Sequence, residues 1–452
     1  MATDEPVMLA SPASPTAGRR PLTPRGVAFA TMFGNAIELY DFIIYSYAAG
    51  AVFGPLFFPT DAAWVGTLLA FSTQALAFFV RPLGAIIFGR VGDRWGRRAP
   101  VLLSLAFMGS ATVLVGLLPT YAVVGAAAPI LLTVLRLLQG VAIGGEYPGA
   151  VVVAVEHAPP HHKTLYGAFP QIGNMLGSLL GGIVLVISTL AVSPETWRAG
   201  AWRVPFLLSA VLLVIGLAIR TRLAETPEFV RATEGAVKHG RVSFGVLLRR
   251  SAQPLVIATL LWIGPLAFSY AFLNSVIAFV SSWRTDLAPV DAQIGLIITS
   301  VLLITVVTVT ARYGDRLGPD RVVLASGIWF VVWAVPSYAL IDAQVPVLLW
   351  TGMAVGAIGY GAFGGVAPRL ISLLFPVEFR FIGVGVCIAL SGIIAGAVLP
   401  IPALAWVGET GGSSVPLMLM VIVAGLATVA GWVWLRAYRK RHPEVVTAGS
   451  DT

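Results

Sequence analysis

The sequence predicts an all-α integral membrane protein, with twelve transmembrane helices arranged as two pseudo-symmetric six-helix bundles. Composition, the spacing of apolar stretches and a repeat between the two halves predict it. Of the 452 residues, 57% are hydrophobic and 11% are charged, and the mean hydropathy is +0.88. Soluble domains carry roughly 25% charged residues, so a soluble fold of this length would lack the polar surface to cover its apolar residues. Lipid is therefore the solvent for most of the chain.

A helix needs about 20 mostly apolar residues to cross a bilayer. Gly and Pro are abundant inside the apolar stretches, which lipid-embedded helices tolerate better than soluble ones. Twelve stretches are long enough: 27–57, 63–88, 99–118, 122–155, 164–192, 203–222, 253–282, 289–311, 322–341, 345–374, 381–408 and 414–436. The first twenty residues have no apolar core, so we expect no cleavable signal peptide.

The Lys and Arg residues predict the orientation. If both termini are cytoplasmic, most of these residues lie in the tails and the cytoplasmic connections. Only Arg198, Arg203 and Arg284 lie on the external side, and three more lie within spans: Arg81, Arg136 and Arg369. The positive-inside rule therefore predicts a multi-pass protein of the cytoplasmic (inner) membrane with both termini in the cytoplasm. The same placement explains the net charge of +8, because basic residues lie along the anionic leaflet. We expect the lipid bilayer, and no nucleic acid, as a partner.

Two connections repeat the same pattern. The segment GRVGDRWGRR (89–98) follows the second span, and ARYGDRLGPDR (311–321) follows the eighth, close to half a chain away. Such repetition is typical of secondary transporters whose site lies at the repeat interface. The predicted organisation is a cytoplasmic tail, a six-helix bundle, a cytoplasmic linker, a second bundle and a cytoplasmic tail: 1–25, 26–222, 223–250, 251–437 and 438–452.

Several motifs carry a resemblance to a known family. They are G-x-x-x-D-R-x-G-R-R after the second span, GNAIELYDF (34–42), RPLGAIIFG (81–89), RLLQGVAIGGEYPGA (136–150), WRVPFLLS (202–209) and ETPEF (225–229). Because these motifs follow one another in this order, the chain resembles the major facilitator superfamily, and within it the metabolite:H+ symporter branch. The resemblance implies the major facilitator fold and proton-coupled uptake of a small metabolite. Leu39 stands where relatives usually carry Trp, so the resemblance leaves the substrate open.

The first span carries two carboxylates, Glu38 and Asp41, on one helical face. An ionisable group at mid-bilayer costs roughly 2.5 to 3.5 kcal/mol on insertion scales, so each one needs a reason. All five His residues lie outside the spans, so we expect a carboxylate to carry the coupled proton. The alternative is a buried ion pair that only fixes helix packing.

Arg136 and Gln139 lie at similar depth in the fourth span. A guanidinium can hold a carboxylate through two hydrogen bonds, which favours a carboxylate or carboxylate-bearing zwitterion as substrate. The alternative is that Arg136 pairs with Glu38 or Asp41. Four further polar residues could line a cavity or join helices through hydrogen bonds: Tyr40, Tyr270, Asn274 and Tyr360.

The resemblance further implies that Asp93, Arg97 and Glu146 form a charge latch on the cytoplasmic side. The predicted inner gate comprises Gly89, Asp93, Arg94, Gly96, Arg97, Arg98 and Glu146. The second-half copy retains Asp315 and Arg316, but Pro319 removes a backbone donor and Asp320 reverses the sign of Arg98. We therefore expect a weaker second latch. For Arg369 we expect the side chain to snorkel to the membrane interface. For Arg81 the sequence does not decide between snorkelling and a functional role.

These observations favour a secondary transporter over an enzyme. The predicted function is proton-coupled uptake of a small organic acid or zwitterion by a monomer, with no cofactor and no metal. A proton-driven exporter on the same fold is the alternative. A membrane-embedded enzyme would need His pairs or a Cys cluster, but the five His lie outside the spans and Cys387 is the single cysteine.

Overall fold

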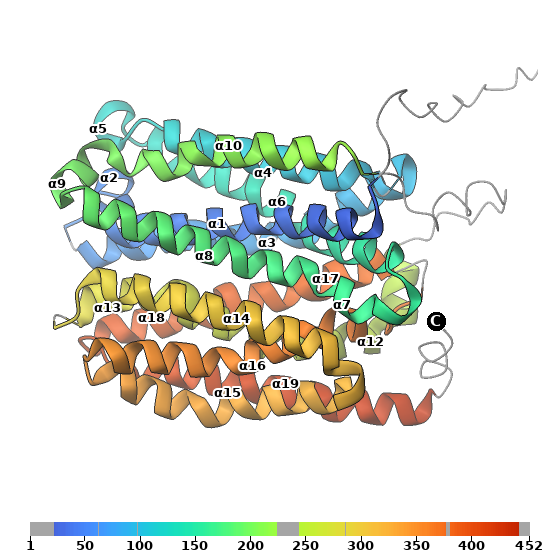
Figure 1. Ribbon diagram of the computed structural model, residues 1–452. Helices are drawn as coiled ribbons and strands as arrows, with labels where there is room; N and C mark the ends of the chain where they lie inside the picture. The colour runs from blue at the N-terminus through green and yellow to red at the C-terminus, as the bar shows by residue number, and fades with distance from the viewer. Residues whose placement is uncertain are drawn as a thin grey trace, which may run out of the picture.

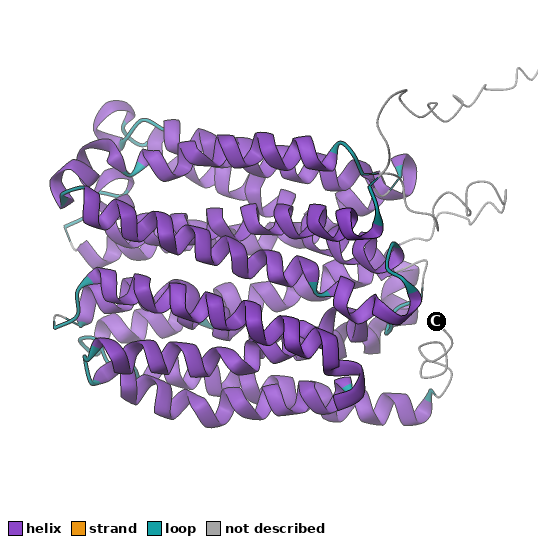
Figure 2. Cartoon of the chain, in the orientation of Figure 1, coloured by secondary structure: helices purple, strands orange, loops and turns teal. Residues whose placement is uncertain are grey.

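The computed structural model describes residues 22–61, 63–96, 98–223, 244–284, 286–376 and 380–442. The predicted segment ETPEF and the central linker from 224 to 243 lie outside the described residues, as does Arg97. The described chain consists of helices joined by short loops, as Figure 2 shows. Twelve of the helical segments are long and apolar enough to cross a membrane, which confirms the predicted fold class.

The first bundle lies in the upper half of Figure 1, coloured blue to green, and the second lies below, coloured yellow to red. The helices of the first are α1 (Pro24–Ala48), α2 (Gly54–Phe57), α3 (Ala63–Trp95), α4 (Arg98–Leu117), α5 (Tyr121–Val124), α6 (Ala127–Glu156), α7 (Lys163–Gly167), α8 (Phe169–Ala191), α9 (Pro194–Thr196) and α10 (Arg203–Arg220). Those of the second are α12 (Phe244–Phe268), α13 (Val276–Trp283), α14 (Pro289–Leu317), α15 (Pro319–Asp342), α16 (Pro346–Ser372), α17 (Arg380–Ile393), α18 (Pro400–Glu409) and α19 (Val415–Arg441).

The two ends of the molecule differ. α1 begins and α19 ends at the end that carries α7, at the right of Figure 1, and the opposite end carries α5 and α9. We call these the α7 end and the α5 end. At the α5 end, Gly125 adopts a φ of +57°, which favours glycine. The predicted fourth span therefore divides into α5 and the crossing helix α6, so 122–155 begins too early.

Glycines bring helices of the first bundle close together. Gly140 and Gly144 of α6 face the backbone carbonyls of Ala77 and Arg81 on α3, where an added Cβ would collide. This contact follows the small-residue spacing that lets membrane helices approach closely. It fixes the backbone of α3 at Arg81 against α6.

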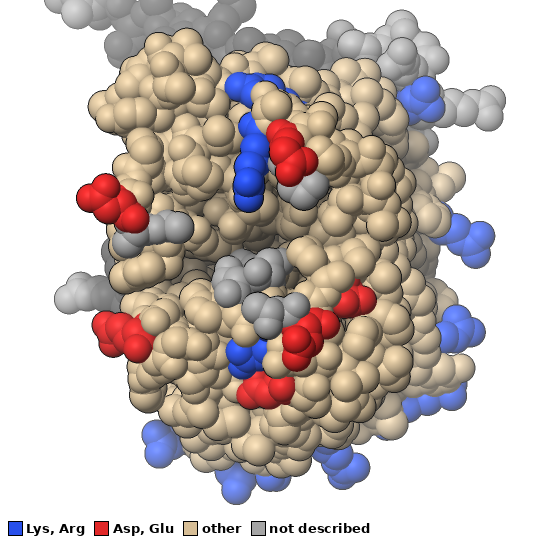
Figure 3. Space-filling model, turned by 90° about the vertical axis from the view of Figure 1, so that its left-hand side faces the viewer, with Lys and Arg blue, Asp and Glu red and all other residues tan. Residues whose placement is uncertain are grey.

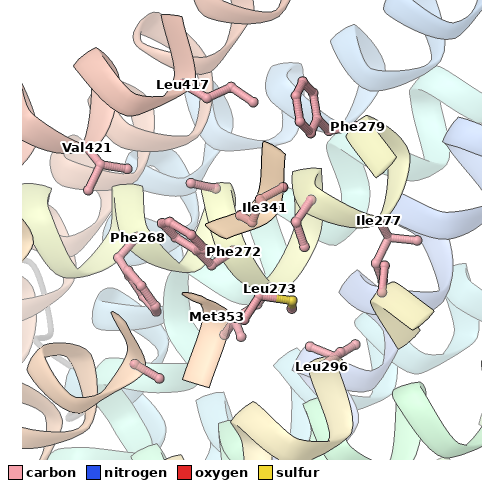
Figure 4. Packing of buried hydrophobic residues seen from close by; sticks show 14 of the residues in the cluster. Phe268, Phe272, Leu273, Ile277, Phe279, Leu296, Ile341, Met353, Leu417 and Val421 are labelled. Carbon is pink, nitrogen blue, oxygen red and sulfur yellow. The ribbon is translucent and has the colours of Figure 1, made fainter. Parts of the chain in front are cut away.

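The bundles meet along α8 with α14 and along α3 with α17. Buried hydrophobic side chains fill the second bundle around α12 and the π-helical segment η4 (Ser269–Ser275), where Phe268 stacks on Phe272 (Figure 4). Irregular backbone of this kind often marks functional positions in helices. Here η4 carries Tyr270 and Asn274, which face the first bundle.

Candidate functional site

A cavity of about 70 Å³ lies between the bundles. Its walls come from α1, α3, α6 and α8 of the first bundle and α12, α16 and α17 of the second. It is lined by Glu38, Arg81, Ile143, Gly144, Tyr147, Pro148, Gln171, Asn174, Trp262, Leu266, Tyr360, Gly385, Ile388 and Ala389. We call it the central cavity. Its position matches the repeat interface where secondary transporters bind substrate.

The central cavity carries one acidic and one basic side chain, Glu38 and Arg81. Three residues of its wall each carry a fully buried polar atom that has no hydrogen-bond partner among the described residues: Glu38 Oε2, Arg81 Nε and Trp262 Nε1. Buried polar groups are normally paired, and an unpaired one is costly. The acidic and the basic side chain on the wall of one cavity suit a polar or charged ligand.

Three amide and hydroxyl groups form a chain along the cavity wall. The Tyr147 hydroxyl donates to Gln171 Oε1 at 3.3 Å, and Gln171 Nε2 donates to the Tyr360 hydroxyl at 3.0 Å. Because Tyr360 belongs to α16, this chain crosses from one bundle to the other. Sequence reasoning missed Tyr147, Gln171 and Trp262. Their polar or aromatic character inside apolar spans was the available signal.

An aromatic cluster closes the cavity toward the α5 end. The ring of Tyr270 lies 5.1 Å from that of Phe78 and 5.6 Å from that of Phe42, between centroids. The guanidinium of Arg81 lies 4.1 Å from the centroid of Phe78. A second cavity of about 40 Å³, lined in part by Tyr270 and Asn274, lies beyond this cluster. Both residues therefore line a cavity, although not the central one.

Asp41 faces the interior of the first bundle. Its carboxylate accepts hydrogen bonds from Thr112 of α4 and, at 2.8 Å, from Ser209 of α10. Gln139 donates to the Thr112 hydroxyl at 2.6 Å, and Arg136 donates to Gln139 at 2.6 Å. Asp41 and Arg136 are each 4% exposed. A buried hydrogen-bonded chain thus connects the predicted carboxylate with the predicted arginine.

Arg136 is absent from the residues that line the central cavity. Its guanidinium lies 3.0 Å from the centroid of the Tyr45 ring, inside the first bundle. The geometry therefore favours the alternative prediction for Arg136, in which its guanidinium interacts with a carboxylate of the first span rather than with the substrate. Tyr40 likewise donates its hydroxyl to the Pro205 carbonyl at 2.9 Å and joins α1 to α10.

Glu146 takes part in a buried ion pair with Arg220 of α10. The distance is 2.6 Å and both side chains are 1% exposed. Ser104 donates to the other Glu146 oxygen at 2.6 Å, and Arg220 donates to the Val101 carbonyl at 2.8 Å. Arg220 is the last residue of α10 and belongs to the interior of the first bundle. The partner lies 74 positions earlier in the chain, so no local pattern reveals the pair.

The rest of the predicted inner gate is described in part. The side chains of Asp93 and Arg94 lie outside the described residues, so the predicted latch stays a prediction. Gly96 has a φ of +92°, which favours glycine at this turn, and Arg98 donates to the Thr221 carbonyl at 2.6 Å. Gly89 packs against Ile382 of α17, across the bundle interface.

The second-half copy of the turn joins the two bundles. Asp315 of α14 pairs with Arg369 of α16 at 2.9 Å, and the Thr164 hydroxyl of α7 donates to both Asp315 oxygens at 2.9 Å. Arg369 therefore forms an ion pair instead of simply snorkelling, which corrects the sequence prediction. Arg316 is exposed. Asp320, whose charge is opposite to that of Arg98 in the first copy, forms an ion pair with Arg439 of α19 at 2.7 Å.

We expect Asp315→Asn to open the α7 end more often, because it removes the charge that holds Arg369 beside Thr164 of the other bundle. A half-exposed pair contributes up to about 1 kcal/mol, so the population of the open state should rise up to about fivefold. Accessibility labelling of a single cysteine in the central cavity, in a Cys387→Ser background, measures this. Asp320→Asn, which breaks a pair within the second bundle, is the matched control. Equal labelling of both variants would contradict the expectation.

Twelve membrane-spanning helices in two bundles, with a charged cavity between the bundles, are features of a secondary membrane transporter. A family model described as "Sugar (and other) transporter" matches residues 27–251. The chain is 32% identical to the inner membrane metabolite transport protein YhjE of Escherichia coli (strain K12), over 92% of this chain and 94% of that protein. The chain belongs to the metabolite transporters of the major facilitator superfamily.

Other relatives are transporters of named metabolites. The chain is 30% identical to the proline/betaine transporter of Escherichia coli (strain K12), over 93% of this chain and 85% of that protein. It is 32% identical to the shikimate transporter of the same strain, over 83% and 86%. Among solved structures, the proton:xylose symporter XylE superposes with a TM-score of 0.73 at 16% identity, covering 92% of this chain and 95% of that one. The similarity to this structure shows that the two proteins share a fold.

Proposed function

We propose that the protein couples proton entry to the uptake of a small carboxylate-bearing metabolite, either an organic acid or a zwitterion. The observation that carries the proposal is the central cavity between the bundles, which is lined by Arg81 and Glu38. A guanidinium binds a carboxylate in a planar, bidentate geometry. Arg81 replaces Arg136 as the proposed counter-charge for the substrate.

The comparisons support transport of such a metabolite. Relatives at 30 to 32% identity are a proline/betaine transporter and a shikimate transporter. Proline, betaine and shikimate each carry a carboxylate. The proposed coupling ion is H+ rather than Na+, because the first span offers carboxylates that can take up and release a proton: Asp41 is buried and Glu38 lines the central cavity. No cofactor is needed for this cycle, and we propose a monomer.

The proposed location is the inner membrane, with the α7 end in the cytoplasm. The relative YhjE is named as an inner membrane protein. Figure 3 looks onto the α5 end, where acidic side chains lie around the face together with some Lys and Arg side chains, and further Lys and Arg side chains project at the right and lower edges. An excess of Lys and Arg marks the cytoplasmic side. Proton entry from the α5 end then drives uptake.

Transport by the purified protein in vesicles tests the proposal. We expect a carboxylate-bearing metabolite from a panel to accumulate when a proton gradient points inward, and to equilibrate when the gradient is collapsed. An inward Na+ gradient alone should have no effect. Accumulation only with an outward gradient would identify the exporter instead, and uptake driven by Na+ would overturn proton coupling.

The two arginines should respond differently to conservative replacement. Arg81→Lys keeps the charge but loses the forked donor geometry, so substrate affinity should fall about tenfold or more. Arg136→Lys should leave affinity within about threefold, because Arg136 does not line the central cavity. Equilibrium binding to the purified variants measures both. A large loss for Arg136→Lys with none for Arg81→Lys would return the substrate to Arg136.

A further inference from the structure

We propose that a groove between α1 and α10 binds an anionic phospholipid, with the lipid phosphate held by Arg25 and Arg222 and an acyl chain lying along the groove. The groove lies at the α7 end, where α1 begins and α10 ends (Figure 1), and has a volume of about 490 Å³. It is lined by Leu22, Gly26, Phe29, Val214, Ile215, Ala218, Ile219 and Arg222. We call it the α1–α10 groove. It shares no lining residue with the central cavity, so the inference is independent of the transported substrate.

Two stripes of side chains form the walls of the α1–α10 groove. Residues three or four positions apart share one face of a helix. The first stripe is Leu22, Gly26 and Phe29, and the second is Ile215, Ala218, Ile219 and Arg222. The ring of Phe29 also lies edge-on to Phe169 of α8, at 5.7 Å between centroids, which holds it at the side of the groove.

The apolar walls are open to the surroundings of the first bundle. The exposed fractions of Phe29, Val214 and Ile215 are 56%, 66% and 42%. Because α1 and α10 belong to membrane-spanning segments, these exposed side chains face hydrocarbon. From Arg222 to Val214 the groove follows α10 for about 12 Å at 1.5 Å per residue. Half of the hydrocarbon core is about 15 Å thick, so an acyl chain that starts at the arginine can lie along the whole groove.

The charge of the groove is concentrated at its outer end. Arg222 lines the groove there, and Arg25 lies on the same face of α1 as Leu22 and Phe29. Both arginines are exposed, and neither takes part in the ion pairs among the described residues. Guanidinium groups bind phosphate through two parallel hydrogen bonds. An anionic headgroup therefore complements this end, whereas a zwitterionic headgroup brings a positive charge of its own.

The combination of an apolar wall and a basic end selects a lipid over other occupants. A soluble phosphate would contact the arginines and leave the apolar stripes unused. A peptide would place its backbone N–H and C=O groups against hydrocarbon, where they lack partners. The N-terminal tail would also bring Arg19 and Arg20 toward Arg25, so that like charges would repel.

Quenching by brominated lipids tests the site in the full-length protein. A single cysteine, Val211→Cys in a Cys387→Ser background, carries a bimane label one turn beyond the groove, so the lining stays intact. In vesicles of dioleoylphosphatidylcholine, we replace lipid stepwise by dioleoylphosphatidylglycerol with brominated chains, and then brominate the phosphatidylcholine instead. The two series give the relative affinity at this position. We expect phosphatidylglycerol to be preferred about tenfold or more, because each arginine near the surface strengthens anionic binding about fivefold.

A matched position in the second bundle shows whether the preference belongs to the groove. Val332 of α15 is 60% exposed and lies as far along its helix from the exposed Arg321 as Val211 lies from Arg222. At Val332→Cys we expect a preference of about threefold or less, typical of general surface attraction. Equal preferences at the two positions would overturn the proposal, and this comparison leaves both groove arginines unaltered.

Two sets of variants separate the charge from the shape of the groove. The double variant Arg25→Gln with Arg222→Gln should reduce the preference at Val211→Cys to about threefold or less. Its matched control, Arg312→Gln with Arg321→Gln, removes two exposed arginines of the second bundle at the same end and should leave the preference unchanged. Ala218→Trp keeps both arginines but fills the groove, so it should lower the preference as far as the double arginine variant does.

Three further outcomes would overturn the proposal. Full preference in Ala218→Trp would reduce the effect to surface charge without a groove. Displacement of phosphatidylglycerol by about 10 mM sn-glycerol 3-phosphate would assign the arginines to a soluble anion. Failure of both brominated lipids to quench the label at Val211→Cys, with normal quenching at Val332→Cys, would show that another part of the protein covers the groove.

Discussion

Replacing Glu146 by Gln, with Arg220 left in place, is expected to be among the most destabilising single changes in this protein. The guanidinium of Arg220 would stay buried at 1% exposure with its counter-charge removed. Breaking a buried pair by removing one partner costs about 3 to 5 kcal/mol. Thermal unfolding of the purified protein in detergent, followed by the loss of the monodisperse elution peak, measures the effect.

Two further variants make this test specific. Asp320→Asn breaks an ion pair whose side chains are 24% and 40% exposed, so it should cost about 1 kcal/mol or less. The double variant Glu146→Leu with Arg220→Met removes both charges and should recover much of the loss, because apolar replacements of buried pairs are often neutral. A Glu146→Gln variant as stable as the unaltered protein would contradict the buried ion pair between Glu146 and Arg220.

Gly34→Ala provides an independent check on the same region. Gly34 lies against the Arg220 guanidinium, and an added Cβ would overlap it. The guanidinium would have to leave the carboxylate of Glu146, so we expect a loss of stability close to that of Glu146→Gln. A small effect would indicate that Arg220 approaches Glu146 from another direction.

Asp41→Asn is expected to abolish accumulation against a gradient while preserving exchange. Asn has the shape of Asp and can keep the contacts with Thr112 and Ser209, but it cannot take up a proton. With one proton per substrate, an inward gradient of about two pH units can drive about 100-fold accumulation, at tenfold per 1.4 kcal/mol. The variant should instead reach equal concentrations inside and outside.

The control for this experiment is Asp61→Asn, which neutralises an exposed aspartate at the α5 end. It should accumulate substrate as the unaltered protein does. Exchange of internal for external labelled substrate confirms that Asp41→Asn is folded and binds. Normal accumulation by Asp41→Asn would place the coupled proton elsewhere, with Glu38 as the next candidate.

The sequence by itself determined the class of this protein. Low charge content, twelve long apolar stretches and the repeat around Asp93 and Asp315 establish a two-bundle membrane protein, because lipid allows few other structures to such a chain. The sequence also identified the carboxylates and Arg136, since an ionisable residue inside an apolar span is conspicuous. Periodicity placed Glu38 and Asp41 on one face of α1.

Only the tertiary structure separated the roles of these residues. Three positions along a helix of 3.6 residues per turn leave side chains about 60° apart, so a single face can serve two environments. Neighbouring helices decided the outcome: α4 and α10 enclose Asp41, whereas Glu38 reaches the space between the bundles beside Arg81. The ion-pair partner of Glu146 could not be identified from the sequence either, because Arg220 belongs to another helix, which only tertiary packing brings close.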